Sequence, residues 1–273
     1  MAGAHGKSLT VGIAGLGAVG TVVARRLGNG MPGLRLTAIA VRDAARAQDR
    51  LAKDGIDATL VALEALADHA DIVIEAIPAA HFRAVAEPAI AARRIFMPLS
   101  AGALLDNFDL VARAEAHGAR IIVPTGALLG LDAVRAAAMG EIVSVRMITR
   151  KPPQGLVGAP YLVQNGISLD GLNAPRRVFE GTAREGARGF PANVNVAAAL
   201  ALAGIGPDRT MLEIWADPAL ERNTHTIEVD ADSARFRMTI ENVPSENPRT
   251  GKLTALSVLT CLQGLVAPFR VGS

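Results

Sequence analysis

A glycine-rich turn lies between an apolar segment and a helical segment near the start of this 273-residue chain. Residues 11–20 read VGIAGLGAVG, and the helical stretch TVVARRL follows at once. In such a strand–turn–helix, Gly15 permits the tight turn, Gly17 lets the backbone approach a pyrophosphate, and Gly20 lets the helix pack on the strand. The helix N-terminus then offers unpaired N–H groups to phosphate oxygens. The alternative is a glycine turn that serves packing alone.

The motif therefore predicts a bound dinucleotide, and we expect a nicotinamide cofactor, NAD or NADP. The residues that we expect to contact it in this turn are Gly15, Gly17, Ala18, Val19 and Gly20.

Strand-like and helix-like segments alternate after the turn. Apolar strands are predicted at residues 11–14, 34–41, 71–76, 95–100 and 120–124. Alanine-rich helical stretches separate them at residues 60–70, 82–93 and 108–117. Strands separated by helices at this spacing predict βαβ units and a parallel sheet.

The pattern changes after about residue 130. We expect strands at residues 142–150, 222–229 and 233–241, a loop at 155–174 and a closing helix at 251–265. The last two strands alternate like a pair in an open, antiparallel sheet. The predicted fold class is α/β, with a Rossmann-type parallel-sheet domain and a smaller α+β substrate domain. The expected domains are residues 1–132, with the C-terminal helix of 247–273 packing back on them, and residues 133–246.

Composition supports an ordinary soluble enzyme. Hydrophobic residues make up 50% of the chain and charged residues 20%, which argues against disorder. A net charge of +2 and 3% aromatic residues do not favour nucleic acid as a partner. No uncharged stretch has the length and continuity of a membrane span, and a single cysteine, Cys261, excludes an internal disulfide. We therefore expect a cytoplasmic protein with neither nucleic acid nor membrane as a partner.

The choice between NAD and NADP is expected to depend on the residues after the second strand. Asp43 can accept from the ribose 2′-hydroxyl and favour NAD, whereas Arg42 can meet a 2′-phosphate and favour NADP. Both could instead be solvated loop charges. The pair does not decide the cofactor, although Asp43 leads us to expect a moderate preference for NAD.

Polar groups suited to chemistry lie in the second half of the chain. Asn193 and Asn195 precede an apolar helical stretch, where one amide suffices as a cap and the other can bind a carboxamide or carboxylate. His225 lies in a predicted strand among polar neighbours, and an imidazole with a pKa near 6.5 can transfer protons at neutral pH. Helix caps and a structural histidine are the alternatives. No spacing of His, Cys and carboxylates predicts a metal site.

Several motifs together resemble the bacterial and archaeal L-aspartate dehydrogenases. They are GIAGLGAVG, VPTGALLGLDAV, TRKPP, FPANVNVAAALALAG, the DP…RNTHTIEV stretch and PSENPRTGKLTALSVL, and they span almost the whole chain. The resemblance implies oxidative deamination of L-aspartate to oxaloacetate and ammonia with NAD or NADP. It also implies an iminoaspartate intermediate that can feed NAD biosynthesis, and a homodimer.

The resemblance assigns roles to individual residues. His225 matches the active-site histidine of the family, and Ala127 and Asn195 match cofactor-contacting positions. The two substrate carboxylates need donors, which Lys151 or Arg150, with Asn193 and Thr224, could supply. The alternative for Lys151 is a solvated surface charge.

Two other interpretations stay open. One is another two-domain dehydrogenase or reductase, similar to homoserine dehydrogenase or dihydrodipicolinate reductase. The other is a non-catalytic protein that senses NAD(H). The polar surroundings of His225 argue against the sensor, because binding alone needs no proton-transfer group.

Overall fold

The computed structural model describes residues 8–191, 194–245 and 251–272 of the chain. The chain divides into two compact units, of which unit 1 contains residues 1–124 and 255–271 and unit 2 contains residues 125–254 and 272–273. The sequence pattern alone predicts these two boundaries at residues 132 and 246.

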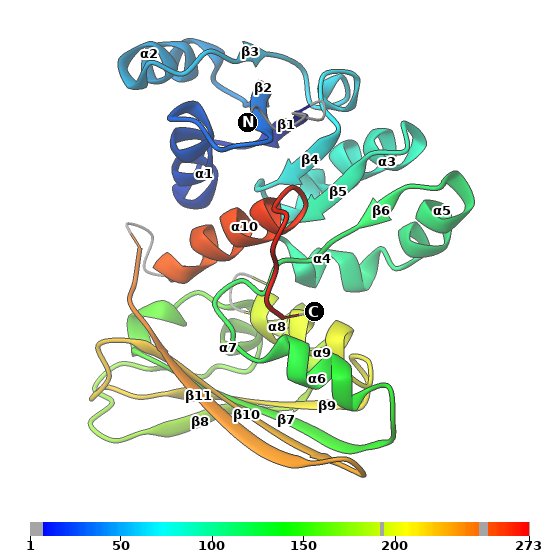
Figure 1. Ribbon diagram of the computed structural model, residues 1–273. Coiled ribbons are helices and arrows are strands. Elements are labelled where there is room, and N and C mark those ends of the chain that lie inside the picture. Colours follow the sequence, from blue (N-terminus) through cyan, green and yellow to red (C-terminus); the bar gives the residue numbers. More distant parts are fainter. Residues whose placement is uncertain (1–7, 192–193, 246–250, 273) are drawn as a thin grey trace. The chain divides into compact units, whose positions relative to one another are not determined.

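Unit 1 is built on a six-stranded parallel sheet, which confirms the predicted α/β class (Figure 1). The strand order β3-β2-β1-β4-β5-β6 is that of a dinucleotide-binding sheet. The strands are β1 (Leu9–Ala14), β2 (Leu34–Ala40), β3 (Thr59–Leu60), β4 (Ile72–Glu75), β5 (Ile95–Pro98) and β6 (Arg120–Ile121). The five strands expected from the sequence are all present, and β3 is an addition at the edge.

Helices cover both faces of this sheet. They are α1 (Ala18–Gly28), α2 (Ala44–Asp54), α3 (Phe82–Ala91), α4 (Ala101–Asp106), α5 (Asp109–His117) and α10 (Lys252–Gly264), with short 3-10 helices at Leu66–Asp68 and Ala79–His81. Helices α1, α2 and α10 bury apolar side chains, including Leu27, Leu51 and Leu262, in one core with β1 and β2. On the other face, Phe82 of α3 packs edge-on against Phe96 of β5, with ring centroids 5.6 Å apart.

Unit 2 contains a five-stranded mixed sheet of order β11-β10-β7-β9-β8. Its strands are β7 (Ile142–Lys151), β8 (Arg176–Thr182), β9 (Thr210–Ala216), β10 (Asn223–Ala231) and β11 (Arg235–Asn242). Its helices are α6 (Leu131–Ala137), α7 (Pro160–Gln164), α8 (Ala183–Gly189) and α9 (Asn195–Ala203), with a 3-10 helix at Pro153–Gly155. Figure 1 shows α6, α8 and α9 over one face of the sheet.

Three sequence predictions are wrong in detail. The sheet of unit 2 is not wholly antiparallel, because β9 pairs with β7 in parallel, and neither β8 nor β9 was expected. Residues 60–70 form β3 and a three-residue 3-10 helix instead of a longer helix. In this segment Leu66 is buried against Gly12. This tertiary packing overrides the helix propensity of the alanines, because propensity is only a weak determinant of local structure. The expected loop at 155–174 contains α7, which begins at Pro160, where a missing N–H costs nothing.

Candidate functional site

The three glycines of the first turn have different surroundings. Gly15 has φ +97°, and a Cβ there would lie 2.5 Å from the carbonyl oxygen of Ala76. A Cβ on Gly20 would collide with the carbonyl oxygen of Gly15. Gly17, in contrast, has nothing within 4 Å of the position that a Cβ would take. The fold therefore needs the first and third glycines, whereas the space at Gly17 is open to a ligand.

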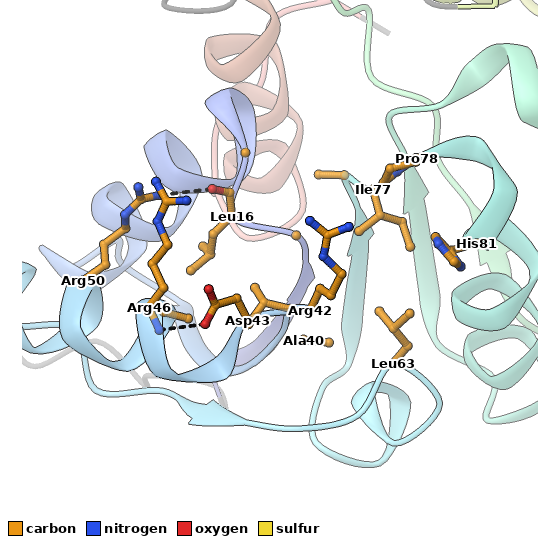
Figure 2. Close-up of a pocket in the computed structure, with 15 residues that line it drawn as sticks. Leu16, Ala40, Arg42, Asp43, Arg46, Arg50, Leu63, Ile77, Pro78 and His81 are labelled. Atoms are coloured by element: carbon orange, nitrogen blue, oxygen red, sulfur yellow. Dashed lines mark hydrogen bonds between the residues drawn. The ribbon is translucent and has the colours of Figure 1, made fainter.

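This open space belongs to a pocket of about 590 Å³ in unit 1 (Figure 2). Of the five residues predicted in the turn, Gly15 and Gly17 line the pocket, while Ala18, Val19 and Gly20 form the first turn of α1. The first helical hydrogen bond runs from the Thr21 N–H to the Gly17 carbonyl at 3.0 Å. The N–H groups before it have no intrahelical acceptor, so the residues present fit a dinucleotide pyrophosphate.

The residues after β2 form the adjoining wall of the pocket. Arg42 and Asp43 both line it, as do Arg46 and Arg50 of α2. Asp43 is also the N-cap of α2, and its Oδ1 accepts from the Arg46 N–H at 3.0 Å. Sequence reasoning missed Arg46 and Arg50, although their spacing of four residues places both on one helix face.

Sequence reasoning also missed Glu75, a fully buried carboxylate at the end of β4. Its Oε1 accepts from the Ile77 N–H and the Ser100 hydroxyl, both at 3.0 Å, and its Oε2 accepts from the Ser100 N–H at 3.1 Å. Burial raises the pKa of the Glu75 carboxyl, against the lowering effect of these hydrogen bonds. The carboxylate thereby joins the turns that follow β4 and β5, and Ile77 is part of the pocket wall.

A second group of polar side chains lies on the sheet of unit 2. His225 of β10 pairs in register with Thr149 of β7, and its Nδ1 lies 3.1 Å from the Thr149 hydroxyl. Lys151 lies two residues further along β7 and therefore on the same face of the sheet. All three are buried, with exposures of 3% for His225, 2% for Thr149 and 3% for Lys151. The sequence alternative of Lys151 as a solvated charge is therefore wrong.

This environment changes the acid–base behaviour of His225. Burial, followed by the positive charge of Lys151, lowers the pKa of the imidazole to about 3. The sequence expectation of a pKa near 6.5 is thus corrected, because the buried ring cannot easily carry a charge beside an ammonium group. At neutral pH the ring is neutral, with one nitrogen facing the Thr149 hydroxyl.

Two predicted substrate contacts lie on the opposite face of this sheet. Side chains alternate along a strand, so Thr224 points away from the face that carries His225. Arg150 likewise neighbours Lys151 but faces the other way, where its guanidinium lies 4.9 Å from the Trp215 ring centroid. Strand alternation therefore places Thr224 and Arg150 on the face opposite His225, and substrate binding by Thr224 stays a prediction.

Three predicted residues remain: Asn195, Asn193 and Ala127. Asn195 is the first residue of α9, whose N-cap is Val194, so the expected amide cap is not at Asn195. Asn193 lies outside the described residues. Ala127 is 9% exposed, and its carbonyl accepts from Asn242 Nδ2 at 2.9 Å. Each of these residues belongs to unit 2.

Neither a metal site nor a membrane span is found within the described ranges. No three His, Cys, Asp or Glu side chains there gather closely enough to hold a metal ion. Among the helices in those ranges, none has the length and apolar character needed to cross a membrane.

The strand order and glycine turn of unit 1 are those of a dinucleotide-binding domain, and unit 2 adds a second sheet with a buried histidine. Residues 15–124 match the family model of the homoserine dehydrogenase NAD binding domain, and residues 132–265 match that of the aspartate dehydrogenase C-terminal domain. The chain belongs to the L-aspartate dehydrogenase family.

Relatives of known name support this assignment over nearly the full length. The L-aspartate dehydrogenase of Bradyrhizobium diazoefficiens is 56% identical, covering 98% of this chain and 95% of its own. L-aspartate dehydrogenase 3 of Bordetella bronchiseptica is 52% identical, covering 98% of each chain. The crystal structure of aspartate dehydrogenase from Thermotoga maritima shares the fold with a TM-score of 0.74 at 23% identity, covering 97% of this chain and 99% of that one.

Proposed function

We propose that this enzyme oxidises L-aspartate with NAD or NADP to iminoaspartate, which water then converts to oxaloacetate and ammonia. The balanced reaction consumes one water and one oxidised cofactor, and it releases an ammonium ion, the reduced cofactor and a proton. The observation that carries the proposal is the buried His225–Thr149–Lys151 group, in a region that matches the aspartate dehydrogenase C-terminal model. When bound, the nicotinamide ring supplies the hydride acceptor.

His225 is the proton-transfer residue in this proposal. Oxidation at Cα requires a free amine lone pair, so the substrate ammonium must first lose a proton. The later attack of water on the imine also requires a base. In the tautomer in which Nδ1 donates to the Thr149 hydroxyl, Nε2 of the neutral ring carries the lone pair that accepts these protons.

Lys151 binds a substrate carboxylate and at the same time controls the basicity of His225. The positive charge of Lys151 contributes to the low pKa of His225 in the protein without substrate. A carboxylate bound at Lys151 offsets that charge, so it raises the pKa of the imidazole toward the range useful for a base. Substrate binding thus makes His225 a stronger base.

The remaining assignments follow the family resemblance. Residues 1–132 with the C-terminal helix hold the dinucleotide, and residues 133–246 hold the substrate. Asn193 contributes to substrate binding, and Ala127 and Asn195 contact the cofactor. In the pocket of unit 1, the glycine turn holds the pyrophosphate and Arg42 and Asp43 face the adenosine ribose.

The test is an assay of cofactor reduction at 340 nm with L-aspartate, L-glutamate, L-homoserine and L-alanine. We expect L-aspartate to be preferred, with oxaloacetate and ammonia formed in equal amounts. Two variants replace the ring by an amide, which is not a base: His225→Asn places it near the Nδ1 position, and His225→Gln reaches the Nε2 position. Both should lower kcat by about 10²–10⁴-fold. Preference for homoserine, or no oxidation of L-aspartate at alkaline pH, would overturn the proposal.

We further propose a cytoplasmic homodimer whose product feeds NAD biosynthesis, as the resemblance implies. Light scattering should give twice the 28.3 kDa chain mass. Borodeuteride added during turnover should convert iminoaspartate in solution to deuterated D,L-aspartate, which mass spectrometry and chiral analysis distinguish from the substrate.

A further inference from the structure

Three arginines line the wall of the dinucleotide pocket beside the glycine turn. Arg42 follows β2, whereas Arg46 and Arg50 are one turn apart on α2 (Figure 2). Nη1 of Arg50 donates to the Leu16 carbonyl and to the Thr21 hydroxyl, both at 3.1 Å. These bonds hold Arg50 against the turn, but both acceptors are neutral, so they do not compensate its charge.

The charges of this wall are unbalanced. Within the described ranges, none of the three arginines forms an ion pair, although other arginines of unit 1 do, such as Arg25 with Asp54 at 2.7 Å. Three arginines line the pocket with one carboxylate, that of Asp43, which gives the lining a net charge of +2. Arg46 and Arg50, four residues apart on α2, carry like charges that repel each other. A pocket lined by this excess of positive charge is suited to an anion.

One carboxylate oxygen of Asp43 is engaged within the protein. Its Oδ1 accepts from the Arg46 N–H at 3.0 Å, as the N-cap of α2. NAD-selective sites use an acidic side chain to accept from the ribose hydroxyls. Here one carboxylate oxygen is already committed to the helix, and Arg46 follows within the first turn of that helix.

We propose that Arg42 and Arg46 bind the 2′-phosphate of NADP, and that the enzyme selects NADP over NAD. The planar guanidinium group matches a phosphate with paired hydrogen bonds. Arg50 supports the glycine turn, which both cofactors need. The proposal rests on the proposed dehydrogenase function, whose cofactor it specifies, and it reverses the moderate NAD preference that Asp43 suggests in the sequence.

Binding measured without any amino acid tests this proposal. Fluorescence titration gives Kd for NADPH and NADH, and calorimetry compares adenosine 2′,5′-bisphosphate with 5′-AMP. We expect the 2′-phosphorylated ligand of each pair to bind about tenfold more tightly or better. Arg42→Ala and Arg46→Ala should each weaken NADPH about tenfold and change NADH by less than about threefold. Arg26→Ala removes the same charge from α1 outside the pocket lining, and it should change neither Kd.

Two further variants separate the roles within the wall. Arg50→Ala should weaken both cofactors, because its side chain braces the turn at Leu16. Asp43→Asn keeps an oxygen for the helix cap but removes the negative charge, so NADPH should bind more tightly and NADH as before. Added salt should weaken NADPH more than NADH.

Equal affinity for NADPH and NADH, or an equal loss of both in Arg42→Ala and Arg46→Ala, would overturn the proposal. A selective loss of NADH in Asp43→Asn would do the same, because it would identify Asp43 as the ribose acceptor of an NAD enzyme. All of these results are obtained without substrate. The assignment of L-aspartate therefore stands or fails separately, in the activity assay.

Discussion

The dinucleotide pocket and the His225 group are built in different ways from the same chain. The pocket uses the positive φ of Gly15, the open space at Gly17 and charged side chains that line the cavity. The His225 group joins side chains 76 residues apart in sequence, all buried, with the imidazole held neutral. We propose that guanidinium groups bind a phosphate in the first region, whereas in the second an imidazole kept neutral by burial and by Lys151 transfers protons.

The largest expected effect separates the two regions through His225. We expect His225→Gln to lower kcat by about 10²–10⁴-fold, the usual contribution of a general acid–base group. Cofactor affinity should change little, because His225 is not among the residues that line the dinucleotide pocket. Steady-state kinetics, together with NADPH and NADH titration, measures both quantities.

The relative changes in kcat and KM distinguish a catalytic from a positioning role of the imidazole. A residue that only positions substrate would raise KM and leave kcat near normal. If kcat of the variant stays within about threefold of the parent enzyme, well below the catalytic range, His225 is structural. Lys151 would then be the next base to examine.

The second prediction concerns pH and stability. The pKa of His225 is about 3 in the folded protein against 6.5 for the free side chain, so the unfolded chain binds the additional proton between these values. His225 therefore contributes stability above pH 6.5, and this contribution is lost as pH falls toward 3, by about 1.4 kcal/mol for each pH unit. Urea unfolding of the parent and of His225→Gln between pH 7 and 4 measures the difference in slope. Parallel curves would contradict the low pKa.

The sequence predicts the two regions unequally. The glycine turn and Arg42–Asp43 are short and contiguous, so their pattern can be recognised in the sequence itself. The pairing of Thr149 with His225 depends on strand register, which a single sequence does not specify. The sequence therefore indicates His225 and Lys151 as separate candidates, but neither their neighbour Thr149 nor the placement of Thr224 on the other face.

The parallel sheet of unit 1 is predictable because each strand is an apolar run bounded by helices. Unit 2 is harder to predict, since β9 inserts beside β7 in parallel and separates it from β8. Such long-range pairing leaves no local signal. The role of Glu75 could not be predicted for the same reason. Its hydrogen-bond donors include Ser100, which lies 25 residues away in the sequence.

The third prediction tests whether the open space at Gly17 is needed for cofactor binding but not for folding. Gly17→Val should weaken both cofactors about tenfold or more, since the added side chain enters the space where the pyrophosphate approaches. Its melting temperature should hardly change. Gly15→Ala is the matched control, because φ +97° and the Ala76 carbonyl make any Cβ there costly to the fold. Unaltered binding in a folded Gly17→Val protein would refute the assigned turn.

The smallest expected effect tests the hydrogen bond that orients the imidazole. Thr149→Val has nearly the same shape as threonine but removes the hydroxyl that lies 3.1 Å from His225 Nδ1. The loss of one such bond, worth about 0.5–1.5 kcal/mol, should lower kcat roughly three- to tenfold without weakening the cofactor. Thr149→Ser restores the hydroxyl and should recover most of kcat, which a purely steric role for Thr149 would not explain. The pH–kcat profile of Thr149→Val should also shift, because the bond favours one tautomer of the ring. Equal activity of the valine and serine variants would show that the sheet alone orients His225.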